Sequence, residues 1–149
     1  MSASETEAEA VVAGVLGDYA AAVLAKDVDA FLSLYDADVR VFDTWGRWSH
    51  EGAAAWRHAV EAWFGSLGDE RVQVDFDDVR AWGGDGCVVA SATVAYAALS
   101  PAGERLRSMQ NRMTWGLRLT AGRPRIVHEH TSAPLGDDLK GILRRPPPA

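Results

Sequence analysis

The residue whose position points most directly to chemistry is Asp43, at the end of the segment DVRVFD. Alternation predicts a β-strand in which Val39, Val41 and Asp43 share a face. A carboxylate on an apolar face must be paired, exposed at the strand end, or held in a cavity where desolvation raises its pKa. In the cavity it could act as a general base. The alternative is structural, with Asp43 capping the DTWG turn through its own backbone.

Two histidines one residue apart, in the segment RIVHEHTSAP, are a second candidate. Strict alternation puts Ile126, His128 and His130 on one face of a strand and Glu129 on the other. Such a pair can supply two metal ligands, but a third has no evident source. We therefore expect no metal. The pair either lines a ligand cavity or is held by hydrogen bonds at a sheet edge.

Arg112 lies in the segment QNRMTWG, in the middle of a predicted strand. Apolar residues occupy the other face of that strand, at positions 109, 113, 115 and 117. An arginine here could hold a carboxylate with both of its terminal nitrogens, or lie along the solvent face. Alternation favours solvent, and a β-bulge would reverse that orientation.

Composition excludes several classes of function. The 149 residues carry a formal net charge of −6, without a basic cluster in the body of the chain, so nucleic acid is not an expected partner. Cys87 is the only cysteine, which suits a reducing compartment. The acidic N-terminus does not resemble a signal peptide, and the uncharged segment 86–103 reads as a strand and a turn. We expect a cytoplasmic protein without a membrane span.

Hydrophobic periodicity predicts helices over residues 5–25, 28–35 and 51–67, and a strand over 38–43. Beyond Gly68 only strands separated by turns are expected. This order predicts an α+β domain over residues 1–136, in which three N-terminal helices pack on the concave face of a curved antiparallel sheet. The proline-rich tail, 137–149, is expected to be mobile.

The apolar residues of one long strand predict assembly. They are Val88, Ala90, Ala92, Val94 and Tyr96. If this strand shows them on the face that the helices leave open, they are too apolar for water. A homodimer formed through the sheet would cover them.

Two segments carry a resemblance to a known family. YDADVRVFDTWG and GRPRIVHEHTSAP are similar to segments of the nuclear transport factor 2-like superfamily, and the second resembles the W-x-I-V-H-x-H-x-S-x-P ending of its SnoaL-like branch. Pro124 stands near the usual tryptophan. The resemblance extends from about Tyr19 to Pro134 and implies a cone-shaped α+β fold. It says little about function, because this superfamily hosts isomerases, cyclases, hydrolases and assembly domains.

Within that superfamily, ketosteroid isomerase has a tyrosine and an aspartate at a spacing that Tyr19 and Asp43 reproduce, and Tyr35 matches a tyrosine between them. The resemblance implies that Asp43 is the general base and that Tyr19 donates to an oxyanion. The second acid of that enzyme falls on the segment 111–114, which contains no acid. The calcium/calmodulin-dependent kinase association domain instead offers matches to Arg112, His128 and His130, in pockets that suit small carboxylates.

Two functions follow as hypotheses. In the first, a pocket lined by Trp45, Trp56 and Trp63 binds a small, partly apolar substrate, on which Asp43 acts as base. The reaction would be a cofactor-independent isomerisation, cyclisation or hydrolysis. In the second, the domain is not catalytic and serves ligand binding or dimerisation. A carboxylate at position 43 that shares its cavity with Tyr19, and has no basic partner, would favour the first.

Overall fold

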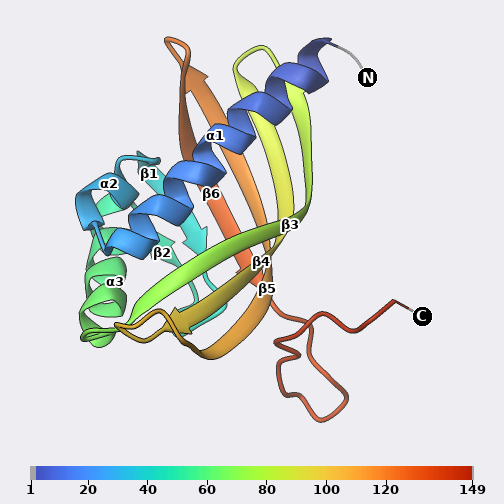
Figure 1. Cartoon of the computed structure of the whole chain (residues 1–149). Coiled ribbons are helices and arrows are strands. Elements are labelled where there is room, and N and C mark those ends of the chain that lie inside the picture. Colours follow the sequence, from blue (N-terminus) through green and yellow to red (C-terminus); the bar gives the residue numbers. More distant parts are fainter. Residues whose placement is uncertain (1–2, 149) are drawn as a thin grey trace.

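The computed structural model describes residues 3–148 and contains the three expected helices, the third of which follows the first two strands (Figure 1). Helix α1 spans Ala3–Ala25, α2 spans Val28–Leu32 and α3 spans Ala53–Ser66. Asp27 caps α2 by accepting from the backbone N–H of Ala30 at 3.0 Å. The apolar positions that predicted α1 are all buried: Val12, Val15, Leu16, Tyr19 and Val23.

Six strands form one sheet. Their bounds are Tyr35–Phe42 for β1, His50–Glu51 for β2, Arg71–Gly84 for β3, Cys87–Leu99 for β4, Arg105–Thr120 for β5 and Arg123–Ser132 for β6. The order across the sheet is β2-β1-β6-β5-β4-β3. Strands β3 to β6 are consecutive antiparallel hairpins, as the turn spacing predicts. Strand β1 instead runs parallel to β6, a pairing that local pattern does not reveal.

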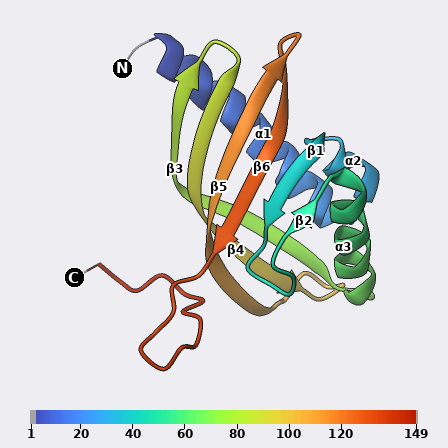
Figure 2. The ribbon, with the colours of Figure 1, turned by 180° about the vertical axis from the view of Figure 1, so that it is seen from behind.

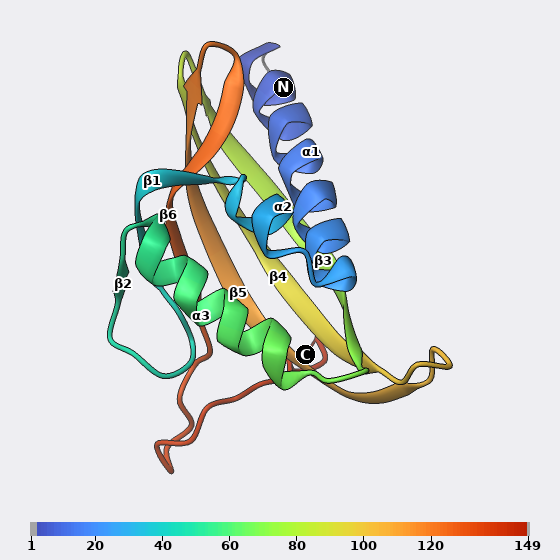
Figure 3. The same ribbon diagram turned by 90° about the vertical axis from the view of Figure 1, so that its left-hand side faces the viewer.

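The sheet is curved and open, and the helices lie on its concave face (Figures 1 and 3). Helix α1 packs lengthwise on β3, whereas α3 packs on β1 and α2 contacts both other helices. The opposite face carries no helix (Figure 2). The predicted α+β class, with a curved sheet and three helices on its concave side, is therefore confirmed.

The strand residues that predicted a dimer point the other way. Val88, Ala90, Ala92 and Val94 are buried, and Tyr96 packs partly buried against the core. They face the helices because alternation in β4 puts them on the same side as the buried Asn111, Met113 and Trp115 of β5. This argument for a homodimer was wrong, and any dimer needs different support.

Helix α1 is long and apolar enough, over Glu5–Ala25, to cross a membrane by length and composition alone. Core helices of soluble proteins pass the same test. Its apolar stripe packs on the sheet, so burial within the domain accounts for the composition.

The C-terminal segment lies below the sheet and makes defined contacts with its helix-free face (Figure 2). The backbone N–H of Gln110 donates to the Leu143 carbonyl at 2.7 Å, and the Arg145 N–H donates to the Gln110 side-chain oxygen at 2.7 Å. Arg145 also pairs with Asp77 and Asp78. The mobility expected for residues 137–149 remains a prediction.

Phe31 is the centre of the aromatic core and has no exposed surface. Its ring lies 4.9 Å from that of Tyr19 and 5.3 Å from that of Tyr35. Three rings of α3 complete the cluster: Trp56, Trp63 and Phe64. A single side chain on the five-residue helix α2 thus joins α1, α3 and the start of β1.

We expect Phe31→Ala to lower the free energy of unfolding by about 3–5 kcal/mol, because a large cavity would open between three elements. Phe31→Leu should cost less, since it refills part of the volume. Trp48→Ala is the control, because Trp48 is 96% exposed, and should change stability by less than about 0.5 kcal/mol. Urea unfolding measures all three. Equal losses for Phe31→Ala and Trp48→Ala would contradict this account of the core.

Candidate functional site

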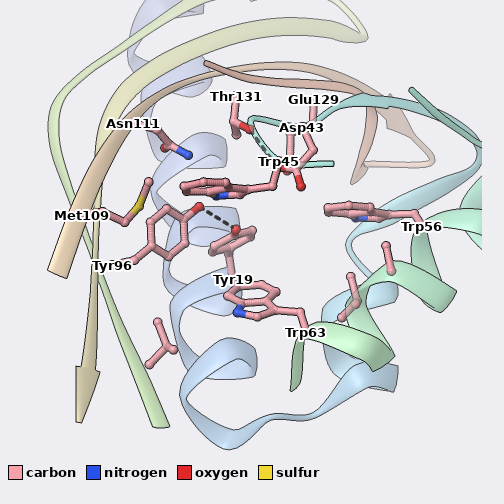
Figure 4. A pocket seen from close by; sticks show the side chains of 13 residues that line it. Tyr19, Asp43, Trp45, Trp56, Trp63, Tyr96, Met109, Asn111, Glu129 and Thr131 are labelled. Atoms are coloured by element: carbon pink, nitrogen blue, oxygen red, sulfur yellow. Dashed lines mark hydrogen bonds between the residues drawn. The ribbon is translucent and has the colours of Figure 1, made fainter. Parts of the chain in front are cut away.

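A cavity of about 390 Å³ lies between the helices and the concave face of the sheet (Figure 4). This volume is ordinary for a small-molecule site. Its walls are mostly apolar and aromatic, with a few polar groups. The lining residues are Tyr19, Asp43, Trp45, Trp56, Ala59, Val60, Trp63, Val72, Tyr96, Met109, Asn111, Glu129 and Thr131.

Each wall comes from a different element. Helix α1 contributes Tyr19, and α3 contributes Trp56 and Trp63 (Figure 4). The inner faces of the strands supply the polar end. Trp45 reaches the cavity from the turn after β1 and remains 53% exposed, so it lies at the boundary between cavity and solvent.

The Asp43 side chain lines this cavity and also accepts a hydrogen bond within the turn that follows β1. Its Oδ1 accepts from the Thr44 backbone N–H and from the Thr131 hydroxyl, each at 3.0 Å. Desolvation raises its pKa, while these hydrogen bonds and the more distant His50 lower it by smaller amounts. Within the described chain, no lysine, arginine or histidine lines the cavity. The pocket and turn roles predicted as alternatives therefore coexist.

A chain of hydrogen bonds orients the Asp43 carboxyl. The Asn111 amide donates to the Thr44 hydroxyl at 3.2 Å, and that hydroxyl donates to Thr131 at 2.9 Å. Thr131 then donates to Asp43. An ionised carboxylate only accepts, so it fixes the direction of every hydroxyl behind it. These hydrogen bonds stabilise the ionised form of Asp43 without placing a positive charge beside it.

Two tyrosine hydroxyls meet in the same cavity. Tyr19 and Tyr96 lie 3.0 Å apart, oxygen to oxygen, as the dashed line in Figure 4 shows. Burial raises the pKa of both phenols, so they remain neutral. Between them they share one hydrogen bond, and one O–H remains available to donate to a ligand.

Glu129 is a second carboxyl group in the cavity, and sequence reasoning missed it. In the pairing of β5 with β6, Gly116 lies opposite His128 while Leu117 lies opposite Ile126, so Val127 is an extra residue. This β-bulge shifts the alternation, and Ile126, Glu129 and Thr131 all become buried. Strict alternation had grouped Ile126 with the histidines instead.

The Glu129 carboxyl is 1% exposed. Its Oε1 accepts from the Tyr35 hydroxyl at 2.6 Å and from the Trp115 indole N–H at 2.9 Å. Desolvation raises its pKa to about 7, the two donors oppose this, and Asp43 adds a further increase by charge repulsion. Tyr35 thus acts on the cavity through Glu129 and does not itself line it.

Four of the predicted site residues do not line this cavity: Tyr35, which acts through Glu129, and Arg112, His128 and His130. Arg112 and His130 line a shallow polar groove on the helix-free face, together with Ser91, Thr93 and Ser132. His128 donates from Nδ1 to the Arg40 carbonyl at 2.8 Å. Arg112 lies on the helix-free face because β5 has no bulge at that point and alternation continues through it. In β6, the bulge at Val127 puts His128 and His130 on the same face as Arg112.

Tyr19, Asp43, Trp45, Trp56 and Trp63 do come together as predicted. No group of three or more metal-ligating side chains occurs in the part of the chain that the structure describes. Asn111, Tyr96 and Thr131 were not expected in the site. Tyrosine and threonine are common in strands, and no motif surrounds Asn111, so only the register identifies these three residues.

Replacing Glu129 tests its buried neutral form. Its pKa rises from 4.5 to about 7 on folding, so the folded state holds the proton more tightly. This contribution to stability is complete below pH 4.5 and is lost as the pH rises through 7. Glu129→Gln keeps the acceptor for Tyr35 and Trp115 but cannot ionise. We expect the variant to be more stable than the wild type above pH 7, by up to about 3 kcal/mol.

Urea unfolding of both proteins at about pH 4 and pH 8 measures this difference. The two free energies should converge at the lower pH, because Glu129 is then mostly neutral in the folded and the unfolded state. Parallel pH profiles would mean that Glu129 is ionised in the folded protein throughout this range.

Comparison with known proteins supports the same fold. The SnoaL-like domain family matches residues 12–136. No curated protein sequence shows a significant match. Among solved structures, an NTF2-like protein of unknown function from Pseudomonas putida KT2440 is 20% identical, with a TM-score of 0.81 over 95% of this chain and 98% of that one.

Two further structures have similar folds. A Catenulispora acidiphila protein in complex with S-DNPA is 16% identical, with a TM-score of 0.72 over 85% of this chain and 93% of its own. A Xanthomonas campestris protein, proposed to be a calcium/calmodulin dependent protein kinase II association domain, is 17% identical, with a TM-score of 0.65 over 81% and 84%. At these identities the likeness concerns the fold alone. With its family match over most of its length, the chain belongs to the SnoaL-like domain family, and it shares its fold with the NTF2-like protein from Pseudomonas putida.

Proposed function

We propose that the chain binds a small, partly apolar molecule in this cavity and catalyses a cofactor-independent reaction on it, with Asp43 as general base. An isomerisation, cyclisation or hydrolysis fits, because each begins with removal of a proton by a carboxylate. Membership of the SnoaL-like family supports small-molecule binding. The proposed reaction and the role of Asp43 rest on the geometry of the site.

The observation that carries the proposal is a desolvated carboxylate without a cationic partner. Asp43 lines a largely apolar cavity, and its hydrogen-bond donors are a backbone N–H and a hydroxyl. Arg40, which precedes it on the same strand, is occupied at the surface by Glu51 at 2.9 Å. Desolvation without ion pairing raises the pKa of a carboxyl and strengthens it as a base.

The Tyr19 and Tyr96 hydroxyls supply the complementary function. When a base removes a proton from carbon, negative charge develops on a nearby oxygen of the substrate. A neutral phenol hydroxyl held in a dry cavity stabilises this charge without reorganising. The pair therefore serves as the oxyanion donor, with Tyr19 in the role that the resemblance implies.

The cavity walls favour a planar ligand. Trp45, Trp56 and Trp63 present aromatic faces around a space that suits a ring system. The Catenulispora structure, which shares the fold, holds S-DNPA. Its ligand lends support to a small-molecule site in this chain.

Replacement of Asp43 tests the proposal with a generic substrate. The probe is 5-nitrobenzisoxazole: a base removes its ring C–H proton, the N–O bond breaks, and a coloured phenolate forms. We expect the wild type to accelerate this elimination and Asp43→Asn to reduce the acceleration by roughly 100-fold or more. Asp43→Asn should remain at least as stable, because it keeps an acceptor oxygen and loses a desolvation cost.

Two further variants make the result specific. Asp38→Asn neutralises an exposed carboxylate of the same strand and should leave the rate unchanged. Asp43→Ala removes the acceptor of the turn and should cost about 1 kcal/mol of stability as well as the activity. If Asp43→Ala loses stability but retains the elimination rate, the catalytic role is wrong and a non-catalytic binding domain becomes the better account.

Assembly is a second part of the proposal. We propose a homodimer formed through the helix-free face of the sheet. Trp82 and Val89, which pair across β3 and β4, are 48% and 43% exposed on this face. The kinase association domain proposed for the Xanthomonas relative lends support to oligomerisation.

Sedimentation at micromolar concentration should give a dimer, and Val89→Arg should give a folded monomer because it buries an unpaired charge at the contact. Ala13→Arg, on the exposed side of α1, is the control and should remain dimeric. A monomeric wild type would refute the proposed assembly without affecting the cavity.

A further inference from the structure

We propose that Glu129 is the proton donor that works with Asp43 in this cavity, so that the site performs acid–base chemistry with two carboxyl groups. Asp43 takes a proton from carbon, and Glu129 delivers one to the substrate oxygen that gains the electrons. The inference rests on the proposed role of Asp43. It adds a catalytic residue and narrows the substrate to molecules in which an oxygen becomes more basic as a proton leaves carbon.

The first support is the position of the side chain. Glu129 is fully enclosed within the domain and lines the same cavity as Asp43 (Figure 4). Strands β1 and β6 are neighbours, and Val41 pairs with Glu129 while Phe42 pairs with His130. Asp43 follows directly on β1, so the two carboxyl groups come from neighbouring positions of the sheet and reach the same end of the cavity (Figure 4).

The second support is the way in which Glu129 is held. Both hydrogen bonds go to Oε1, and the Trp115 indole can only donate. A proton on the carboxyl is therefore favoured on Oε2, the oxygen that these donors leave for a ligand. Because Glu129 lines the cavity, the neutral acid has an O–H that neither of these donors occupies and that a ligand there can accept.

The Tyr35 hydroxyl is also held in one direction, with its proton toward Glu129. The buried indole N–H of Trp56 has no hydrogen-bond partner, but it lies near enough to the Tyr35 hydroxyl to lower the pKa of that phenol. A donor on that side favours the Tyr35 oxygen as acceptor and directs its proton to Glu129. The Tyr35 hydroxyl then holds Oε1 and leaves Oε2 free.

Burial raises the pKa of Glu129 most, and the negative charge on Asp43 raises it further. The ionisable groups coupled to Glu129 are Asp43, which follows β1, Tyr35 of β1, Tyr19 of α1 and Tyr96 of β4. The three phenols are neutral, so the charge that acts on Glu129 is the negative one on Asp43. A pKa of about 7 for Glu129 suits transfer in either direction near neutral pH.

The test uses two substrates that differ in their need for an acid. In both 5-nitrobenzisoxazole and unsubstituted 1,2-benzisoxazole, Asp43 takes the C–H proton, the C–H electrons form the nitrile, and the N–O electrons go to the phenolate oxygen. Glu129 protonates that oxygen. The unsubstituted phenolate is more basic, so its departure depends more on a proton donor.

We expect Glu129→Gln to slow elimination of the unsubstituted compound by about 10- to 100-fold and that of the nitro compound much less. The wild-type rate on the unsubstituted compound should fall as the pH rises above 7, and this fall should be absent from Glu129→Gln. Asp43→Asn should slow both substrates. Glu129→Gln retains the contacts of Tyr35 and Trp115, so it should fold.

Carbon-13 labelling of glutamate carboxyl groups gives a direct reading of the protonation state. The resonance that disappears in Glu129→Gln should titrate near pH 7. A titration below about pH 5, or equal effects of Glu129→Gln on the two substrates, would overturn the proposal and leave the role of Asp43 standing. A wild type that accelerates neither substrate would instead refute the proposed function, and this inference with it.

Discussion

The rest of this site depends on one buried and one partly buried carboxyl group, Glu129 and Asp43, in a cavity whose lining includes no cationic side chain. Desolvation makes the charged form of each expensive, and an arginine or lysine would relieve that cost at the expense of basicity. The fold instead provides neutral donors: a backbone N–H and a hydroxyl for Asp43, and a phenol and an indole for Glu129. These donors hold the carboxyls in place but leave their proton affinities high.

These donors come from parts of the chain that are distant in sequence, and the fold brings them together. Asp43 and Glu129 are adjacent only because β1 pairs in parallel with the last strand, and the donors to Glu129 come from β1 and β5. Helix α1 then closes the cavity with Tyr19, and α3 closes it with two tryptophans. The aromatic cluster around Phe31 fixes these helices relative to the sheet, so core packing and site geometry depend on the same contacts.

Local pattern predicted the helices and the hairpins and put Asp43 on the apolar face of its strand, because each depends on periodicity within a few residues. It left the pocket and turn roles of Asp43 as alternatives. The parallel pairing of β1 with β6 involves residues about 90 positions apart, and no local signal encodes it. The placement of Glu129 failed for another reason. A single extra residue, Val127, reverses the faces of the strand, and nothing in RIVHEHTS marks where alternation breaks. The histidines were candidates because of their side-chain chemistry, whereas the strand register determines which side chains reach the cavity.

That bulge makes the chemical identity of the cavity a matter of strand register. If Val127 took an ordinary place in the alternation, the residues after it would exchange faces, and the wall that now offers the carboxyl of Glu129 and the hydroxyl of Thr131 would offer two imidazoles. Loss of the bulge at unchanged strand length could therefore replace these two groups by histidine side chains, while Asp43, the helices and the aromatic walls stayed the same. On such a scaffold, related chains of similar shape can be expected to diverge in reaction type through changes in register as readily as through substitution.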